Sequence, residues 1–126
     1  MTFSEVLGAV LRYHRKRHGY DQAHVGHALG ISTSAWCRIE TGRTVATITH
    51  LRAAAGVLGV EAYDLLRQAE QICERVPPGC IVVEAANDTM HAVGSKAVYA
   101  LVVHALRSTR RPSEAVPRGQ RPRRRA

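Results

Sequence analysis

Residues 22–42 read QAHVGHALGISTSAWCRIETG, and this stretch decides how the chain folds. Its apolar residues recur at helical spacing in two short runs, the first ending near Gly30 and the second containing Trp36 and Ile39. Gly30 can adopt the positive φ with which many helices end, and Ser32 stands where an N-cap residue accepts a hydrogen bond from the next helix. The stretch therefore predicts two short helices joined by a corner of about three residues, as in a helix-turn-helix.

The second of these helices is predicted to have one buried and one exposed face. If Trp36 and Ile39 point into the core, the helical period turns Thr33, Ser34 and Arg38 toward solvent. Hydroxyl groups and a guanidinium at the exposed start of a helix can form hydrogen bonds with base edges in the major groove of DNA. We therefore expect these three residues to read bases.

A longer series of residues around this corner follows one family pattern. In chain order these are Gln22, Val25, Gly26, Leu29, Gly30, Ile31, Ser32, Arg38, Ile39, Glu40 and Gly42. By these residues the chain resembles the Cro and phage-repressor helix-turn-helix family, the xenobiotic-response-element type, over about residues 7–66. The resemblance implies a five-helix DNA-binding domain. Gly26 departs from the pattern, because the family prefers alanine there and glycine lowers helix stability by about 1 kcal/mol relative to alanine.

The resemblance also implies contacts to the sugar-phosphate backbone of DNA. In the family the glutamine at Gln22 meets a phosphate, and the loop over residues 41–46 grips the backbone through its N–H groups and through Arg43 and Thr44. Such contacts set the depth and angle of docking and carry no sequence information. Gln22, Arg43 and Thr44 are therefore the expected backbone-contacting residues.

A buried ion pair is a further implication of the resemblance. In the family the residue at Arg15, near the end of a helix predicted over residues 3–18, pairs with the glutamate at Glu40. The pair would tie the first helix to the base-reading helix. The residues alone also allow a plainer role, in which the cations of residues 12–17 are solvated and complement the dipole of their helix.

The length of 126 residues allows one domain of ordinary size, or a small domain with an appendage. We expect a mainly α protein with a five-helix, repressor-like DNA-binding domain over residues 1–75. Residues 76–108 are predicted to form an accessory segment, with a short strand and a helix, that packs on the domain or builds a dimer. Residues 109–126 are predicted to be a disordered, arginine-rich tail.

Two helices after the base-reading helix are predicted to complete the domain. The first follows a cap at Thr47 and is expected to cover the core with Ile48, Leu51, Ala55 and Leu58. The second runs over about residues 61–74, which is longer than the core of a monomer needs. Its later turns could pack on a partner subunit or lie under the C-terminal segment.

The C-terminal half changes character at VPPG, residues 76–79, because proline interrupts a helix. CIVVE at residues 80–84 has the β-branched content of a short strand, and residues 95–107 have helical periodicity. Residues 107–125 contain eight arginines and one glutamate, so they supply +7 of the formal charge of +8. A tail of this kind can raise nonspecific affinity for DNA, or it can serve solubility alone.

Several functional classes lack the residues that they need. The longest apolar run, near residues 97–105, is too short to span a bilayer, and the N-terminal residues do not look like a signal peptide. The spacing of Cys73, Cys80, His91 and His104 fits no usual zinc site, and no nucleophile is accompanied by a base and an orienting acid. We expect a cytoplasmic, nucleoid-associated protein that is not an enzyme and has no metal, cofactor or membrane partner.

Cys37 lies near the start of the base-reading helix, on the side predicted to face DNA. A thiol in that place could be oxidised and make DNA binding sensitive to redox state. The alternative is a small side chain at a tolerant position. An unchanged response of DNA binding to oxidant in Cys37→Ser would exclude the redox role.

The whole sequence predicts a sequence-specific transcriptional regulator, acting as a repressor, that binds double-stranded DNA. One unit buries too little surface for tight specific binding, so we expect a homodimer on a palindromic operator with half-sites about one DNA turn apart. In a first alternative, the protein is the antitoxin of a toxin–antitoxin module that autoregulates its operon and neutralises a protein partner through the segment after residue 76. In a second, the motif is a protein-interaction module that no longer reads DNA.

Overall fold

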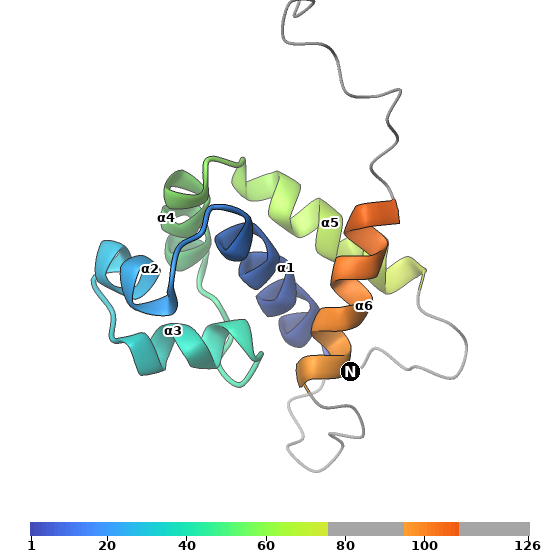
Figure 1. Cartoon of the computed structure of the whole chain (residues 1–126), viewed down its shortest axis with the longest axis horizontal. Helices are drawn as coiled ribbons and strands as arrows, with labels where there is room; N and C mark the ends of the chain where they lie inside the picture. The colour runs from blue at the N-terminus through green and yellow to red at the C-terminus, as the bar shows by residue number, and fades with distance from the viewer. Residues whose placement is uncertain (76–94, 109–126) are drawn as a thin grey trace, which may run out of the picture.

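The structure, a computed structural model, describes residues 1–75 and 95–108, and every regular element in these ranges is a helix (Figure 1). The elements are α1 (Phe3–Arg17), α2 (Gln22–Leu29), α3 (Thr33–Glu40), α4 (Ile48–Leu58), α5 (Ala62–Glu74) and α6 (Ser95–Ser108). The predicted mainly helical fold is confirmed for this part of the chain. The strand expected at residues 80–84 and the tail expected at residues 109–126 lie outside the described residues.

Local hydrogen bonds explain where the helices begin and end. The side chains of Thr2, Asp21, Ser32 and Thr47 each accept a hydrogen bond from the N–H group three residues later and thereby cap α1 to α4. At the corner between α2 and α3, Gly30 ends α2 with a φ of 73°, and the Ala35 N–H donates to the Ser32 hydroxyl at 3.0 Å. The predicted helix-turn-helix corner is confirmed.

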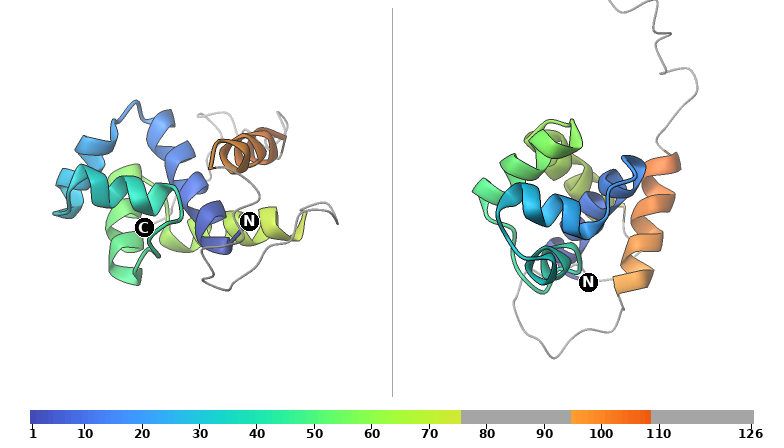
Figure 2. Two further views of the ribbon diagram at one scale, coloured as in Figure 1. Left: turned by 90° about the horizontal axis from the view of Figure 1, so that it is seen from below. Right: turned by 60° about the vertical axis from the view of Figure 1, so that its left-hand side comes forward.

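Helix α1 is the centre of the fold. It contacts α3, α4, α5 and α6, and Figures 1 and 2 show α3 and α6 on opposite sides of it. Residues around its whole circumference are therefore buried, including Val6, Leu7, Val10 and Leu11. A helix enclosed in this way anchors every neighbour, so the position of α3 depends on α1.

The contact between α1 and the end of α3 is made at backbone distance. A Cβ atom at Gly8 would lie 2.4 Å from the Ile39 carbonyl oxygen and 2.5 Å from that of Glu40. Gly42, which follows α3 with a φ of 75°, comes equally close to α1, since a Cβ atom there would lie 2.6 Å from the Cα of Glu5. These two glycines let α3 rest directly on α1.

Helix α6 covers the side of α1 away from α3 and also touches α5. Its buried residues are Val98, Val102 and Leu106. On the α1 side, the Arg12 guanidinium carbon lies 4.3 Å from the centre of the Tyr99 ring, a cation–π contact. Of the apolar residues predicted for one side of this helix, Val98 and Val102 are buried, whereas Leu101 and Ala105 are half-buried.

The later turns of α5 were expected either to pack on a partner subunit or to lie under the C-terminal segment, and burial distinguishes the two. Ala69 is fully buried and Ile72 is 4% exposed, with α6 alongside α5. The apolar residues of these turns are therefore covered by the chain itself, as in the second possibility.

One core prediction for α4 was wrong. Leu51 and Leu58 are buried as expected, but Ile48 is 78% exposed. Ile48 is the first residue of α4, and no neighbouring element in the described residues covers its side chain. Helical periodicity in the sequence cannot show whether a position is covered by another element.

Candidate nucleic-acid interface

Helix α3 has the two faces that the sequence predicted. Trp36 is 0% and Ile39 2% exposed, and both belong to the core. Thr33, Ser34 and Arg38 are exposed. Burial of the indole and the isoleucine therefore turns Ser34 and Arg38 outward, and Thr33 is exposed as the first residue of the helix.

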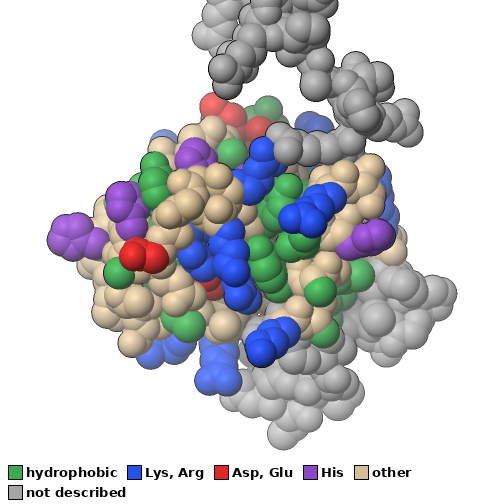
Figure 3. All heavy atoms as spheres, viewed as in Figure 1, with side chains coloured by type: hydrophobic (Ala, Val, Ile, Leu, Met, Phe, Trp, Pro, Cys, Tyr) green, Lys and Arg blue, Asp and Glu red, His purple; other side chains and the backbone are tan. Residues whose placement is uncertain are grey.

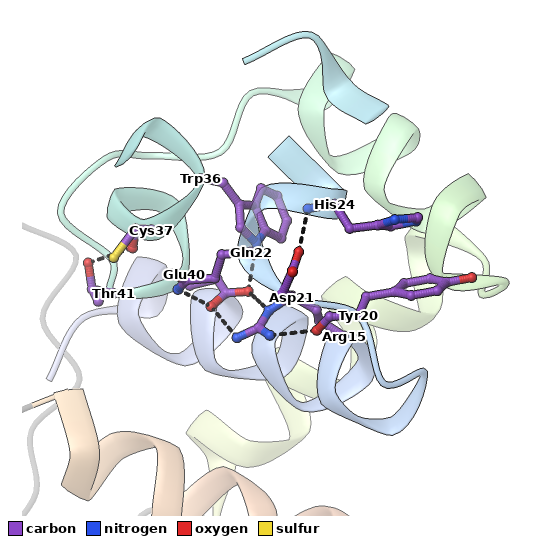
Figure 4. Close-up of polar contacts among 9 residues, drawn as sticks. All are labelled: Arg15, Tyr20, Asp21, Gln22, His24, Trp36, Cys37, Glu40 and Thr41. Atoms are coloured by element: carbon purple, nitrogen blue, oxygen red, sulfur yellow. Dashed lines mark hydrogen bonds and ion pairs between the residues drawn. The ribbon is translucent and has the colours of Figure 1, made fainter. Parts of the chain in front are cut away.

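The buried carboxylate of Glu40 holds the motif together (Figure 4). It accepts hydrogen bonds from Nε and Nη2 of Arg15, from the indole Nε1 of Trp36 at 2.6 Å, and from the amide Nε2 of Gln22 at 2.9 Å. A buried charge is costly unless it is paired and hydrogen-bonded, and here the pairing is to an equally buried arginine. One side chain thus links α1, α2 and α3.

Arg15 and Glu40 stand in the ion pair that the family resemblance implied, since both side chains are buried and in contact. Arg15 also donates from Nη1 to the carbonyl oxygen of Tyr20 at 2.8 Å, which fixes the connection between α1 and α2. The pair therefore sets the position of the whole helix-turn-helix relative to α1.

Two donors to Glu40 were not foreseen from the sequence. Trp36 and Glu40 are four residues apart on one helix, a spacing that brings side chains together and could have signalled their hydrogen bond. Gln22, expected at a DNA phosphate, has its amide nitrogen on Glu40. No sequence signal points to that contact, because it joins separate helices.

The loop after α3 exposes the side chains of Arg43 and Thr44. Their N–H groups, however, both donate to the Arg38 carbonyl oxygen, at 2.9 and 3.1 Å. Two of the loop N–H groups expected at a phosphate are therefore bonded within the protein, to a carbonyl oxygen near the end of α3. Any contact from these two residues to DNA must come from their side chains.

The charge on this side of the molecule comes from exposed arginines. Arg38 and Arg43 are both exposed, whereas the nearby acid, Glu40, is buried and neutralised by Arg15. Figure 3 shows Lys and Arg side chains along the lower edge, on the side where α3 lies. The surface thus carries the sign of charge that attracts phosphate.

His14 belongs to the scaffold behind this surface. Its Nε2 donates to the Gln68 side-chain oxygen at 2.8 Å and so joins α1 to α5. Burial lowers the pKa of His14 from its ordinary 6.5, and the charges of Arg17 and His18 act in the same direction. The hydrogen bond to Gln68 and the charge of Asp64 oppose this shift in pKa.

Comparison with known families agrees with this geometry. Residues 6–69 match a family model described as a helix-turn-helix domain, which is half of the chain. The chain belongs to the helix-turn-helix domain family. The helix-turn-helix itself is α2 and α3, and the matched region ends within α5, before α6 begins. No curated protein and no solved structure matches the chain.

Other kinds of site were also sought in the described ranges. Residues 1–75 and 95–108 contain no group of three or more His, Cys, Asp or Glu side chains that could hold a metal ion. None of the six described helices is long and apolar enough to cross a membrane. The surface of α3 and its loop is therefore the candidate site of this helix-turn-helix protein.

Proposed function

We propose that this protein is a sequence-specific transcriptional regulator that reads the major groove of DNA with the start of α3. The observation that carries the proposal is the complete burial of Trp36 in a helix whose Thr33, Ser34 and Arg38 side chains are exposed. Membership in the helix-turn-helix family supports it, since the second helix of such motifs docks in the major groove.

Each exposed group has a role in this proposal. Arg38 donates to a guanine edge, a contact worth about 1–3 kcal/mol of discrimination against other bases, while Thr33 and Ser34 contact neighbouring bases. The side chains of Arg43 and Thr44 contact phosphates. Gln22 donates one N–H of its side-chain amide to Glu40, and its other amide N–H contacts a phosphate.

The proposed assembly is a homodimer on a palindromic operator. A single small module buries about 600–1,000 Å² on DNA, less than most tight specific complexes bury. Two copies related by a two-fold axis would double that area and place the half-sites about one DNA turn apart. Bound in this way at a promoter, the protein acts as a repressor in the nucleoid, without enzymatic activity or a cofactor.

The test is selection of bound sequences from a pool of random DNA duplexes at physiological salt. The wild-type protein is expected to enrich one sequence motif. Arg38→Ala should lose the preference for guanine at one position of that motif and weaken binding there about 5- to 150-fold, equivalent to the 1–3 kcal/mol of one arginine–guanine contact.

The matched control is Arg67→Ala, which removes an equally exposed arginine on α5. It should enrich the same motif as the wild type. Enrichment of no motif by the wild type would contradict DNA reading and favour a protein-interaction module.

A further inference from the structure

A hollow of about 240 Å³ opens where α6 crosses α5 (Figure 1). Its floor is apolar, because Ile72 of α5 and Leu106 of α6 are buried there and Ala105 lies beside them. Its wall consists of polar residues that recur at helical spacing along α5 and its C-cap, namely Asp64, Arg67, Gln68, Gln71 and Arg75. Small-molecule sites combine apolar walls with a few placed polar groups in this way. We call this hollow the α5–α6 pocket.

The polar groups of the pocket are mostly hydrogen-bond donors. The side-chain oxygen of Gln68 already accepts from Nε2 of His14 at 2.8 Å, so its amide offers chiefly its N–H groups to a ligand. The Arg75 guanidinium and the Gln71 amide have no hydrogen-bond or ion-pair partner among the described residues. Arg75 lies four residues after Gln71, about 6 Å along the helix axis, so both side chains can reach one ligand group. A negatively charged group rich in acceptors would satisfy all three residues.

The charges of the pocket are unevenly placed. Asp64 and Arg67 are three residues apart on α5, so their opposite charges offset each other. Arg75 lies about 16 Å from Asp64 along the helix axis and makes its own end of the pocket positive. The neighbouring acids Glu70 and Glu74 are exposed and do not line the pocket. An anion at the Arg75 end therefore gains charge-assisted hydrogen bonds and stays clear of the Asp64 carboxylate.

The volume of the pocket limits the size of its ligand. A drug-sized molecule occupies about 300–1,000 Å³, which is more than the α5–α6 pocket offers. At about 30 Å³ for each water molecule, the pocket has room for about eight waters, which corresponds to a ligand of about ten non-hydrogen atoms. Such a ligand carries one anionic group and a short apolar body.

We infer that the α5–α6 pocket binds a small organic anion, either a carboxylate or a phosphate ester with a short apolar body. The anionic group accepts hydrogen bonds from Arg75, Gln71 and Gln68, and the apolar body lies on the floor. Because the ligand contacts both helices, its binding stabilises the packing of α6, a helix beyond the family match. The pocket includes no residue of α3 or its loop, so it is separate from the surface proposed to contact DNA.

Titration of the full chain, without DNA, with phenyl phosphate and with benzoate tests the inference. These probes carry the two candidate anionic groups on one small ring, and the tighter probe identifies the group. Inorganic phosphate lacks the apolar body and benzyl alcohol lacks the charge, so each should bind at least about tenfold more weakly. Amide chemical shifts in NMR spectra give the dissociation constants, and the largest changes should fall on α5 and α6.

Arg75→Gln removes the positive charge of the pocket, with Arg52→Gln as its matched control. Arg52 is exposed on α4, so the control removes the same charge away from the pocket. Arg75→Gln should bind the tighter probe at least about tenfold more weakly than the wild type, because it loses a charge-assisted hydrogen bond. Arg52→Gln should stay within about twofold. Equal affinities of the two variants would overturn the inference.

Ala105→Phe tests the location of the ligand independently of charge. Its ring fills the pocket, whereas Ala100→Phe places the same ring at an exposed position of α6 that does not line the pocket. The tighter probe should raise the unfolding temperature of the wild type and of Ala100→Phe, since it binds only the folded state. It should leave the unfolding temperature of Ala105→Phe unchanged. An equal rise in both variants would overturn the pocket as the site.

Two further outcomes would overturn the inference. One is a wild type that binds neither anion more tightly than benzyl alcohol. The other is a set of shift changes confined to α3 and its loop, which would show that the anions collect at the exposed arginines there. Because DNA is absent from these titrations, either failure leaves the proposed reading of DNA untouched.

Discussion

At the scale of single residues, the buried carboxylate of Glu40 fixes the position of exposed side chains that it does not contact. Its carboxylate accepts from side chains of three helices, while Arg38, two residues earlier on α3, has its side chain exposed. The residues proposed to read bases are thereby held by a contact made in the core. Mutations at Glu40, Arg15 or Trp36 should change DNA binding, although none of these three side chains is proposed to contact DNA.

Arg15→Met is predicted to destabilise the protein by about 3–5 kcal/mol, because it leaves the Glu40 carboxylate buried without its counter-charge. Urea unfolding measures the loss. The double variant Arg15→Met with Glu40→Met removes both charges and should recover a large part of the stability. A double variant as unstable as Arg15→Met alone would contradict this account of the pair.

At the scale of elements, the orientation of α3 depends on its direct contact with α1. Gly8 and Gly42 allow this contact, and the sequence pattern did not single out Gly8, because periodicity marks apolar positions and not points of close backbone approach. The helices, the caps at Ser32 and Thr47 and the buried and exposed residues of α3 could be predicted, since they depend on local spacing and capping chemistry. Three features could not be predicted, because they depend on contacts between elements. They are the crossing of α1 and α3, the donors to Glu40 and the exposure of Ile48.

Gly8→Ala is predicted to cost about 3 kcal/mol or more in stability, because its methyl group would overlap the carbonyl oxygens at the end of α3. Gly56→Ala is the control. It also lies within a helix, but a Cβ atom there meets nothing within 4 Å, so alanine should stabilise α4 by about 0.5–1 kcal/mol. Urea unfolding of both variants checks the prediction, and equal effects of the same sign would contradict it.

At the scale of the whole molecule, stability is coupled to pH through His14. In the unfolded chain this histidine binds a proton near pH 6.5, whereas burial lowers its pKa in the folded protein. The unfolded state therefore binds more protons as the pH falls below 6.5, and folding stability decreases until the folded pKa is passed.

His14→Gln is predicted to lose this contribution. Between pH 7 and pH 5 the stability of the wild type should fall more steeply than that of the variant, whose amide can still donate to Gln68. Urea unfolding at several pH values measures the two slopes. The other histidines titrate in both proteins, so only the difference between the slopes is informative, and identical slopes would contradict the role of His14.

The attachment of α6 to α1 has a practical consequence for anyone who trims this protein. The family match ends at residue 69, so a truncation designed from it would discard Val98, Val102 and Leu106. Apolar side chains of α1 that α6 now covers would then be exposed to water, and Arg12 would lose its cation–π contact with the Tyr99 ring. A fragment that ends at residue 69 should aggregate in solution. Fragments expressed for crystallography or spectroscopy should therefore extend through Ser108.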